Sequence, residues 1–139
     1  MAKLDEAVAR RKPITKTPLV PEEQEQITLF EWVEQAKAAH PELAFLYAIP
    51  NGGKRSKPEA VRFQRAGVRK GIPDMFLSVP RGGCHGLYIE LKRLDGGRLA
   101  QEQIEWLNRL SRQGYKCAVC HGWDAARREI MEYIAEGEP

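Results

Sequence analysis

The chain has few cysteines and no long hydrophobic segment. Its 139 residues include three cysteines, Cys84, Cys117 and Cys120. An odd and small number of cysteines argues against the class of small secreted domains that disulfides hold together. No apolar run approaches the roughly 20 residues of a transmembrane helix, and no signal-peptide pattern follows Met1. We therefore expect a cytoplasmic protein without a membrane partner.

One pair of cysteines matches a short motif for covalent haem attachment. Cys117, Cys120 and His121 satisfy the pattern C-x-x-C-H. The run from Tyr115 to Cys120 is typical of a buried strand after a glycine turn, and a strand would point the two cysteines to opposite faces. Because a motif without its structural context carries little weight, we expect buried, apolar-like cysteines and no haem.

The sequence also lacks a strong excess of either charge. The net charge is +3, with 42% hydrophobic and 29% charged residues, which is typical of one soluble globular domain. A polyanion partner is compatible with this balance, so the position of the charges matters more than their sum. Residues 1–20 hold five basic and two acidic side chains with little periodicity, which predicts a disordered basic tail before a folded domain at residues 21–139.

Apolar periodicity and turn residues predict the order α-β-α-β-β-α-β-α. The first helix is expected to turn Ile27, Phe30 and Val33 inward, and the helix after the hairpin to turn Ile104, Leu107 and Leu110 inward. The pattern predicts an α/β (α+β) fold in which helices flank a mixed β-sheet. The expected helices and strands cover residues 21–39, 43–49, 58–67, 75–79, 87–91, 99–112, 115–120 and 123–134.

Two acidic residues and a lysine lie on the two strands of the predicted hairpin. Asp74 follows Gly71-Ile72-Pro73, and Glu90-Leu91-Lys92 ends the second strand. A register that pairs Asp74 with Glu90 or Lys92 would place all three charged side chains on one face. The apolar residues of opposite parity would then face the core, and a slip of one residue would bury the charges. These apolar residues are Met75, Leu77, Val79, Ile89 and Leu91.

This trio has the chemistry of a metal-dependent phosphodiesterase. Asp74 and Glu90 offer hard oxygen ligands for Mg²⁺ or Mn²⁺, and the peptide carbonyl of Leu91 could add another. Lys92 could orient the attacking water or stabilise charge on the phosphorus centre. The alternative is a solvated strand face with a weak surface ion pair. Taken alone, E-x-K on a strand favours that alternative; the strand entry at Asp74 and the matching parity favour the site.

Pro73-Asp74 with Glu90-Leu91-Lys92 resembles the signature of the PD-(D/E)XK nuclease superfamily. The surrounding sequence is similar to one branch, the VRR-NUC (virus-type replication-repair nuclease) domain of short stand-alone phage proteins. The resemblance implies a restriction-endonuclease-like core with Asp74, Glu90 and Lys92 at its site. The matching stretches are Glu22–Trp32, Ile49–Ser56, Gly67–Phe76, Tyr88–Arg93 and Gln103–Leu110 with Gly114-Tyr115.

Two further site residues follow from the resemblance. The family uses a glutamate of the first helix, and here Glu22, Glu23 and Glu25 all compete for that role. We favour Glu22, as a metal ligand, because Glu22 and Gln26 share a helix face; charge placement at the helix N-terminus is the alternative. Gln103 matches a family glutamine that could contact substrate or metal-bound water, or it could be an exposed helix residue.

A basic stretch precedes the hairpin, with Glu59 as its single acid. It is plausible as a track for the phosphate backbone, and the alternative is an ordinary solvated surface. No helix-turn-helix or zinc-finger spacing is present, so shape-selective binding is the more natural inference. The residues of this candidate DNA-binding stretch are Asn51, Lys54, Arg55, Lys57, Arg62, Arg65, Arg69 and Lys70.

The resemblance implies an endonuclease that acts on DNA in replication, repair or recombination. Stand-alone members are expected to form homodimers that cut branched DNA such as four-way junctions, which suits a 139-residue chain with one site. If a phage encodes the chain, it would work in the cytoplasm of a bacterial host. A non-catalytic DNA-binding module and an RNA-directed nuclease stay open as alternatives.

Overall fold

A mixed β-sheet forms the centre of the molecule. The computed structural model describes residues 21–50 and 56–137, and within these the sheet has four strands in the order β1-β2-β3-β4. The first three strands are antiparallel, and β4 runs parallel to β3. This confirms the predicted mixed sheet. The strands are β1 (Leu46–Ala48), β2 (Met75–Leu77), β3 (Leu87–Lys92) and β4 (Lys116–His121).

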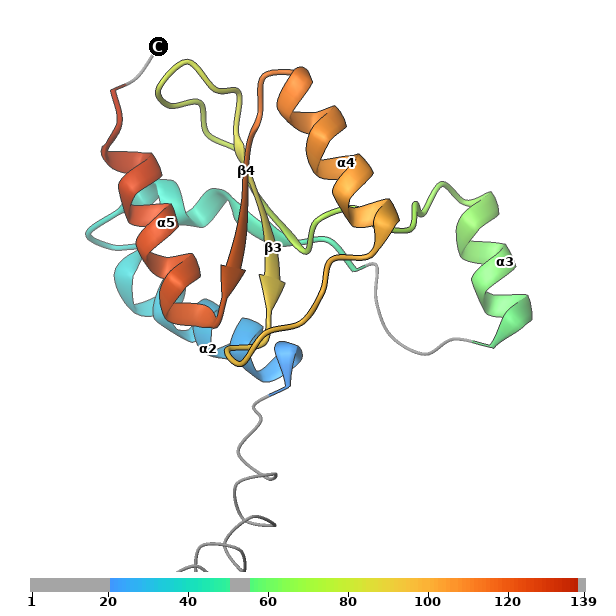
Figure 1. Ribbon diagram of the computed structural model, residues 1–139. Helices are drawn as coiled ribbons and strands as arrows, with labels where there is room; N and C mark the ends of the chain where they lie inside the picture. Colours follow the sequence, from blue (N-terminus) through green and yellow to red (C-terminus); the bar gives the residue numbers. More distant parts are fainter. Residues whose placement is uncertain (1–20, 51–55, 138–139) are drawn as a thin grey trace, which may run out of the picture.

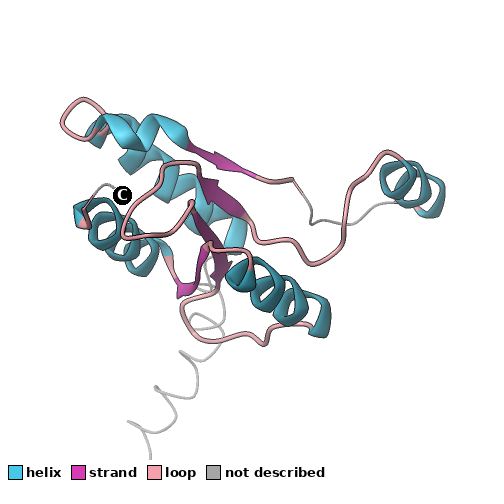
Figure 2. Cartoon of the chain, turned by 90° about the horizontal axis from the view of Figure 1, so that it is seen from above, coloured by secondary structure: helices cyan, strands magenta, loops and turns pink. Residues whose placement is uncertain are grey.

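Helices lie on both faces of the sheet. Figures 1 and 2 show α2 and α5 together on one face, α4 on the other, and α3 standing apart from the rest. Within the described ranges, none of the helices is long and apolar enough to cross a membrane. The predicted order of elements is confirmed, with one added 3-10 turn. The helical elements are α2 (Glu22–Ala36), η1 (Pro41–Phe45), α3 (Lys57–Arg65), α4 (Gln101–Arg112) and α5 (Trp123–Ala135).

The core lies between the sheet and the pair α2–α5. Met75, Leu77, Ile89 and Leu91, which alternate along β2 and β3, are all at most 1% exposed. They pack in one cluster with apolar residues of α2 and α5. The predicted inward face of the hairpin is confirmed, because alternation sends every second side chain to the same side.

The inward face of α2 matches the prediction at Val33, which is buried, and at Phe30, which packs against the core, but not at Ile27. The buried residues are Glu25, Leu29 and Val33, whereas Ile27 is 45% exposed. The cause is Glu25, whose carboxylate accepts a 2.6 Å hydrogen bond from the backbone N–H of Trp123. This bond turns a charged residue inward and selects the 25-29-33 stripe. It also caps α5, because Trp123 is the first residue of that helix.

Two further expectations about apolar segments were wrong. The strand predicted over residues 43–49 is a 3-10 helix followed by only three strand residues, because Pro41 suits the first turn of a helix. Ile104 of α4 is 37% exposed. This helix uses a polar residue, Gln103, to contact the sheet.

Strand β4 places its two cysteines on opposite faces, as predicted. Cys120 lies in the core at 4% exposure, and burial raises the pKa of its thiol to about 12. Cys117 is half-buried on the face that α4 covers, where Ser111 is a hydrogen-bond partner. The cysteine side chains therefore pack as small, largely apolar groups on the two faces of a strand.

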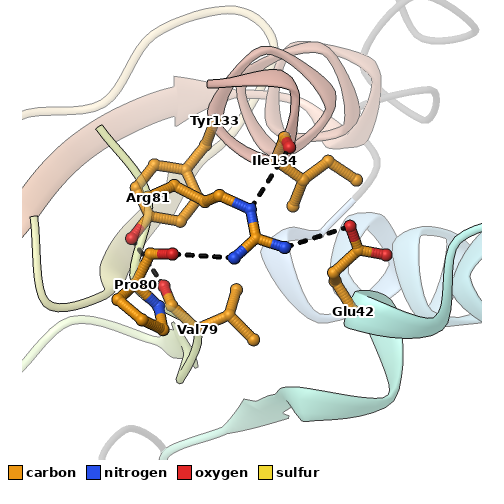
Figure 3. A network of polar contacts seen from close by, with 6 residues as sticks. All are labelled: Glu42, Val79, Pro80, Arg81, Tyr133 and Ile134. Carbon is orange, nitrogen blue, oxygen red and sulfur yellow. Dashed lines mark hydrogen bonds and ion pairs between the residues drawn. The ribbon is translucent and has the colours of Figure 1, made fainter. Parts of the chain in front are cut away.

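A polar network closes the end of the sheet where β2 leads into the hairpin loop (Figure 3). The guanidinium of Arg81 donates to the carbonyls of Pro80 and Ile134 and forms a 3.3 Å ion pair with Glu42. Beside it, the hydroxyl of Tyr133 donates a 2.6 Å bond to the carbonyl of Val79. One arginine thus connects the hairpin loop to η1 and to the end of α5.

We expect Tyr133→Phe to destabilise the protein by about 1–3 kcal/mol, because it leaves the buried Val79 carbonyl without its donor. The measurement is denaturant unfolding followed by circular dichroism. Tyr47→Phe is the matched control: Tyr47 is 50% exposed, and removal of its hydroxyl is expected to change stability by less than about 0.5 kcal/mol. Equal stability of the two variants would contradict a structural role for the Tyr133 hydroxyl.

Candidate active site

The register of β2 and β3 brings Asp74 and Glu90 together. Met75 pairs with Ile89, so the residue before one and the residue after the other lie opposite each other. The Asp74 carboxylate also accepts a 2.8 Å hydrogen bond from the backbone N–H of Leu91. The predicted even register is confirmed, and Asp74, Glu90 and Lys92 share one face of the sheet.

Pro73 limits the regular main-chain pairing of β2 with β3 at this point. Continuation of the register would pair Leu91 with Pro73, and a proline has no N–H to donate to the Leu91 carbonyl. In a strand the N–H and C=O of one residue point to the same side, so this carbonyl lies on the side of Asp74.

Gln103 of α4 connects Glu90 and Lys92. Its side-chain amide donates a 2.8 Å bond to the Glu90 carboxyl, and its oxygen accepts from Lys92 Nζ at 3.2 Å. The same oxygen accepts from the N–H of Ala100 at 2.8 Å, which closes the first turn of α4. Because that N–H can only donate, it orients the amide so that its NH₂ group faces Glu90. Gln103 is therefore a partly buried bridge and not an exposed helix residue.

The charged face of β3 is buried. Glu90 is 2% and Lys92 8% exposed, because α4 covers this part of the sheet. The alternative of a solvated face with a weak surface pair is therefore wrong. Burial, together with hydrogen bonding to and repulsion from the Asp74 carboxyl, raises the pKa of Glu90 to about 9.

The glutamates of the first helix have different roles. Glu25 is buried against α5, whereas Glu22 and Glu23 are exposed. The negative charge of Glu22 contributes to the raised pKa of Glu90, which places it in the electrostatic field of the site. Among the residues that the structure describes, no three Asp, Glu, His or Cys side chains form a group that could hold a metal. Glu22 therefore does not join the pair of carboxyl groups directly.

The donor set of the site suits a hard divalent cation. Asp74 and Glu90 supply carboxyl oxygens, and the Leu91 carbonyl points to the same side, which are the ligand types that Mg²⁺ and Mn²⁺ accept. Two adjacent carboxyl groups in a desolvated place repel each other once both are ionised, and a bound cation offsets that repulsion. The residues present therefore fit a divalent metal.

Exposed basic residues lie on α3 and on the segment that follows it. Lys57, Arg62, Arg65, Arg69 and Lys70 are all exposed, and α3 has no buried residue at all. Figure 1 shows α3 beyond α4 and away from the sheet. Asn51, Lys54 and Arg55 lie outside the described residues, as does the predicted tail at residues 1–20.

The base of this basic segment is attached to α4 by contacts that the sequence did not reveal. The indole N–H of Trp106 donates to the Lys70 carbonyl at 3.1 Å, and Lys70 Nζ lies 3.4 Å from the Glu102 carboxylate. Gly71 has φ +93°, and a Cβ there would lie 2.7 Å from the backbone of Glu102. Only glycine fits this approach, so Gly71 in the Gly-Ile-Pro-Asp run was a signal for it.

The chain is similar to known proteins in both sequence and fold. Residues 20–124 match a family model described as the VRR-NUC domain. Among solved structures, the chain is similar to a "VRR_NUC domain protein" at 29% identity and a TM-score of 0.75, over 86% of this chain and 92% of that one. None of the curated proteins matches.

The two glutamates Glu22 and Glu25 give a direct test of their different environments. Glu25→Ala is expected to lower stability by about 1.5–3 kcal/mol, because it removes a charged acceptor from the first N–H of α5. Glu22→Ala, the matched control one helical turn away, is expected to stay within about 0.5 kcal/mol of the parent. Denaturant unfolding measures both. A larger loss in Glu22→Ala would contradict the assignment.

Proposed function

The chain belongs to the VRR-NUC domain family, a family of nucleases, and from this premise we propose that it is a divalent-metal-dependent endonuclease acting on DNA. The observation that carries the proposal is the group formed by the partly buried Asp74 and the buried Glu90 and Lys92. Gln103 links the last two through hydrogen bonds of 2.8 and 3.2 Å. A carboxyl pair beside a lysine has the groups that phosphodiester hydrolysis requires.

In this proposal Asp74, Glu90 and the Leu91 carbonyl hold Mg²⁺ or Mn²⁺. When bound, the cation neutralises charge on the scissile phosphate and lowers the pKa of a water molecule. The Leu91 N–H keeps the Asp74 carboxylate oriented through its 2.8 Å bond. The exposed Glu22 carboxylate lies close enough to influence Glu90 and is proposed to contact the cation's water shell.

Lys92 is the proposed group that meets the reacting phosphate. An ammonium has three N–H donors, so its bond to Gln103 leaves two for a phosphate oxygen and the attacking water. Its positive charge stabilises negative charge that accumulates on the phosphate in the transition state. Gln103 acts through Glu90 and Lys92 as a positioning residue.

The proposed substrate is branched DNA, such as a four-way junction, bound without sequence readout. The exposed cations of α3 and of residues 69–70 support a contact with the phosphate backbone. Symmetric incision of a junction needs two sites, so we propose a homodimer, and a native mass of two chains is the expected result. The proposed setting is replication, repair or recombination, in the cytoplasm of a host cell.

We expect Asp74→Asn and Lys92→Met to lower the cleavage rate by about 100-fold or more, because each removes charge stabilisation at the phosphate. The assay uses labelled four-way junction, flap, duplex and RNA substrates with Mg²⁺, Mn²⁺ or EDTA. Lys37→Met, an exposed lysine of the α2 terminus, is the control and is expected to cleave normally.

The assay also distinguishes the nuclease from a DNA-binding module and DNA from RNA as the substrate. Absence of cleavage in any metal, combined with intact DNA binding, would replace the enzyme by a non-catalytic binding module. Cleavage of RNA alone would reassign the substrate. Unchanged activity of Asp74→Asn would remove the site assignment.

The basic arm, which we define as α3 with residues 66–70, can be tested through salt dependence. We expect the combined variant Arg62→Gln, Arg65→Gln and Arg69→Gln to bind DNA more weakly and to reduce the slope of log K against log [salt] by about 3, near 0.9 per lost phosphate contact. Lys37→Gln with Arg128→Gln, exposed cations of α2 and α5, is the control. An unchanged slope in the arm variant would exclude this segment from the DNA contact.

A further inference from the structure

Aromatic rings form a row across three strands on the face that carries the site. Tyr47 of β1 lies opposite Phe76 of β2, and Phe76 lies opposite Tyr88 of β3. The Phe76 and Tyr88 rings are stacked, with centroids 4.2 Å apart and planes at 27°. Tyr47 meets Phe76 edge to face at 5.8 Å. The row therefore starts beneath α4 and ends at the open edge strand.

The row is continuous with the acidic pair. Asp74 and Phe76 are two residues apart on one strand extension, as are Tyr88 and Glu90, so alternation places all four side chains on the same face. Two residues of strand span about 6.6 Å. A nucleotide next to a phosphate held by Asp74 and Glu90 is therefore within reach of the rings.

Gly86 leaves space for the Phe76 ring of this row. A Cβ at Gly86 would lie 2.6 Å from Cε1 of Phe76, so only glycine admits the ring in its observed position. Tyr115 packs its ring against Phe76 and Tyr88 and supports them from β4's end of the sheet. Tyr47 differs from these supported rings, because half of its surface is exposed. The row therefore ends in the half-exposed ring of Tyr47.

We infer that Tyr47, supported by Phe76 and Tyr88, stacks an unpaired nucleobase of the DNA next to the scissile phosphate. The inference rests on the proposed function and deepens it, since it names a single-stranded or extruded nucleotide as part of the substrate. A base inside a duplex has both faces occupied by its neighbours, whereas an unpaired base can present one to a tyrosine.

Charge supports a nucleic acid as the occupant. The chain that leaves β1 leads to α3, where Lys57, Arg62 and Arg65 are exposed. Rings together with cations are the combination that binds single-stranded segments, with phosphates on the cations and bases on the rings. Aromatic stacking accepts every base, which fits a sequence without helix-turn-helix or zinc-finger spacing.

The test uses DNA with 2-aminopurine as an unpaired nucleotide at a branch, and a duplex with the same nucleotide paired. Binding is measured in EDTA, where no metal is present for cleavage. Stacking on Tyr47 is expected to quench the fluorescence of the unpaired base. Tyr47→Leu is expected to abolish the quenching and weaken binding of the branched DNA about tenfold, with duplex binding unchanged. Tyr47→Phe, which keeps the ring, is expected to behave like the parent.

Three results would overturn the inference. One is full quenching in Tyr47→Leu, and another is an equal loss of affinity for branched and duplex DNA. The third is a native mass that falls from two chains to one in Tyr47→Leu, which would make this face a contact between copies of the chain. Quenching without cleavage in Mg²⁺ or Mn²⁺ would contradict only the nuclease proposal, and cleavage without quenching only the stacking role.

Discussion

The register between β2 and β3 is the constraint on which the rest of the structure depends. With Met75 opposite Ile89, one set of side chains fills the core and the other forms the site and the aromatic row. A shift of one residue would exchange the two sets, and would place charged groups against Leu29 and Ile130. The bond from Leu91 N–H to Asp74 marks where regular pairing ends and the polar site begins. The positions of the core residues and of the site residues thus both follow from this one register.

Burial of charge is the second consequence of this arrangement. Because α4 covers β3, Glu90 and Lys92 lose most of their contact with water, and Gln103 supplies hydrogen bonds to both. Buried ionisable groups are costly unless they are paired, and a carboxyl beside another carboxyl is only partly paired. The raised pKa of Glu90 expresses that cost. A divalent cation on the proposed ligands would offset it.

The two faces of the sheet carry different helices and different groups of residues. One face carries α2 and α5, whose contacts include the Glu25 bond to the start of α5 and the Arg81 network at the far end (Figure 3). The other face carries α4, the acidic pair and the rings, and it leaves β1 and β2 more open. The basic arm joins this second face through Trp106 and Gly71. Stability and the proposed chemistry therefore depend on largely separate sets of residues.

The sequence by itself determined the order of elements, the inward face of the hairpin and the shared face of Asp74, Glu90 and Lys92. These follow from short-range rules, because strand alternation and turn residues act over a few positions. Long-range partners decided the rest. Glu25 faces inward because of Trp123, and Lys92 is buried because α4 packs over it. Tyr47, Phe76 and Tyr88 come together only when three strands pair, since no local pattern records which distant residue will lie opposite another.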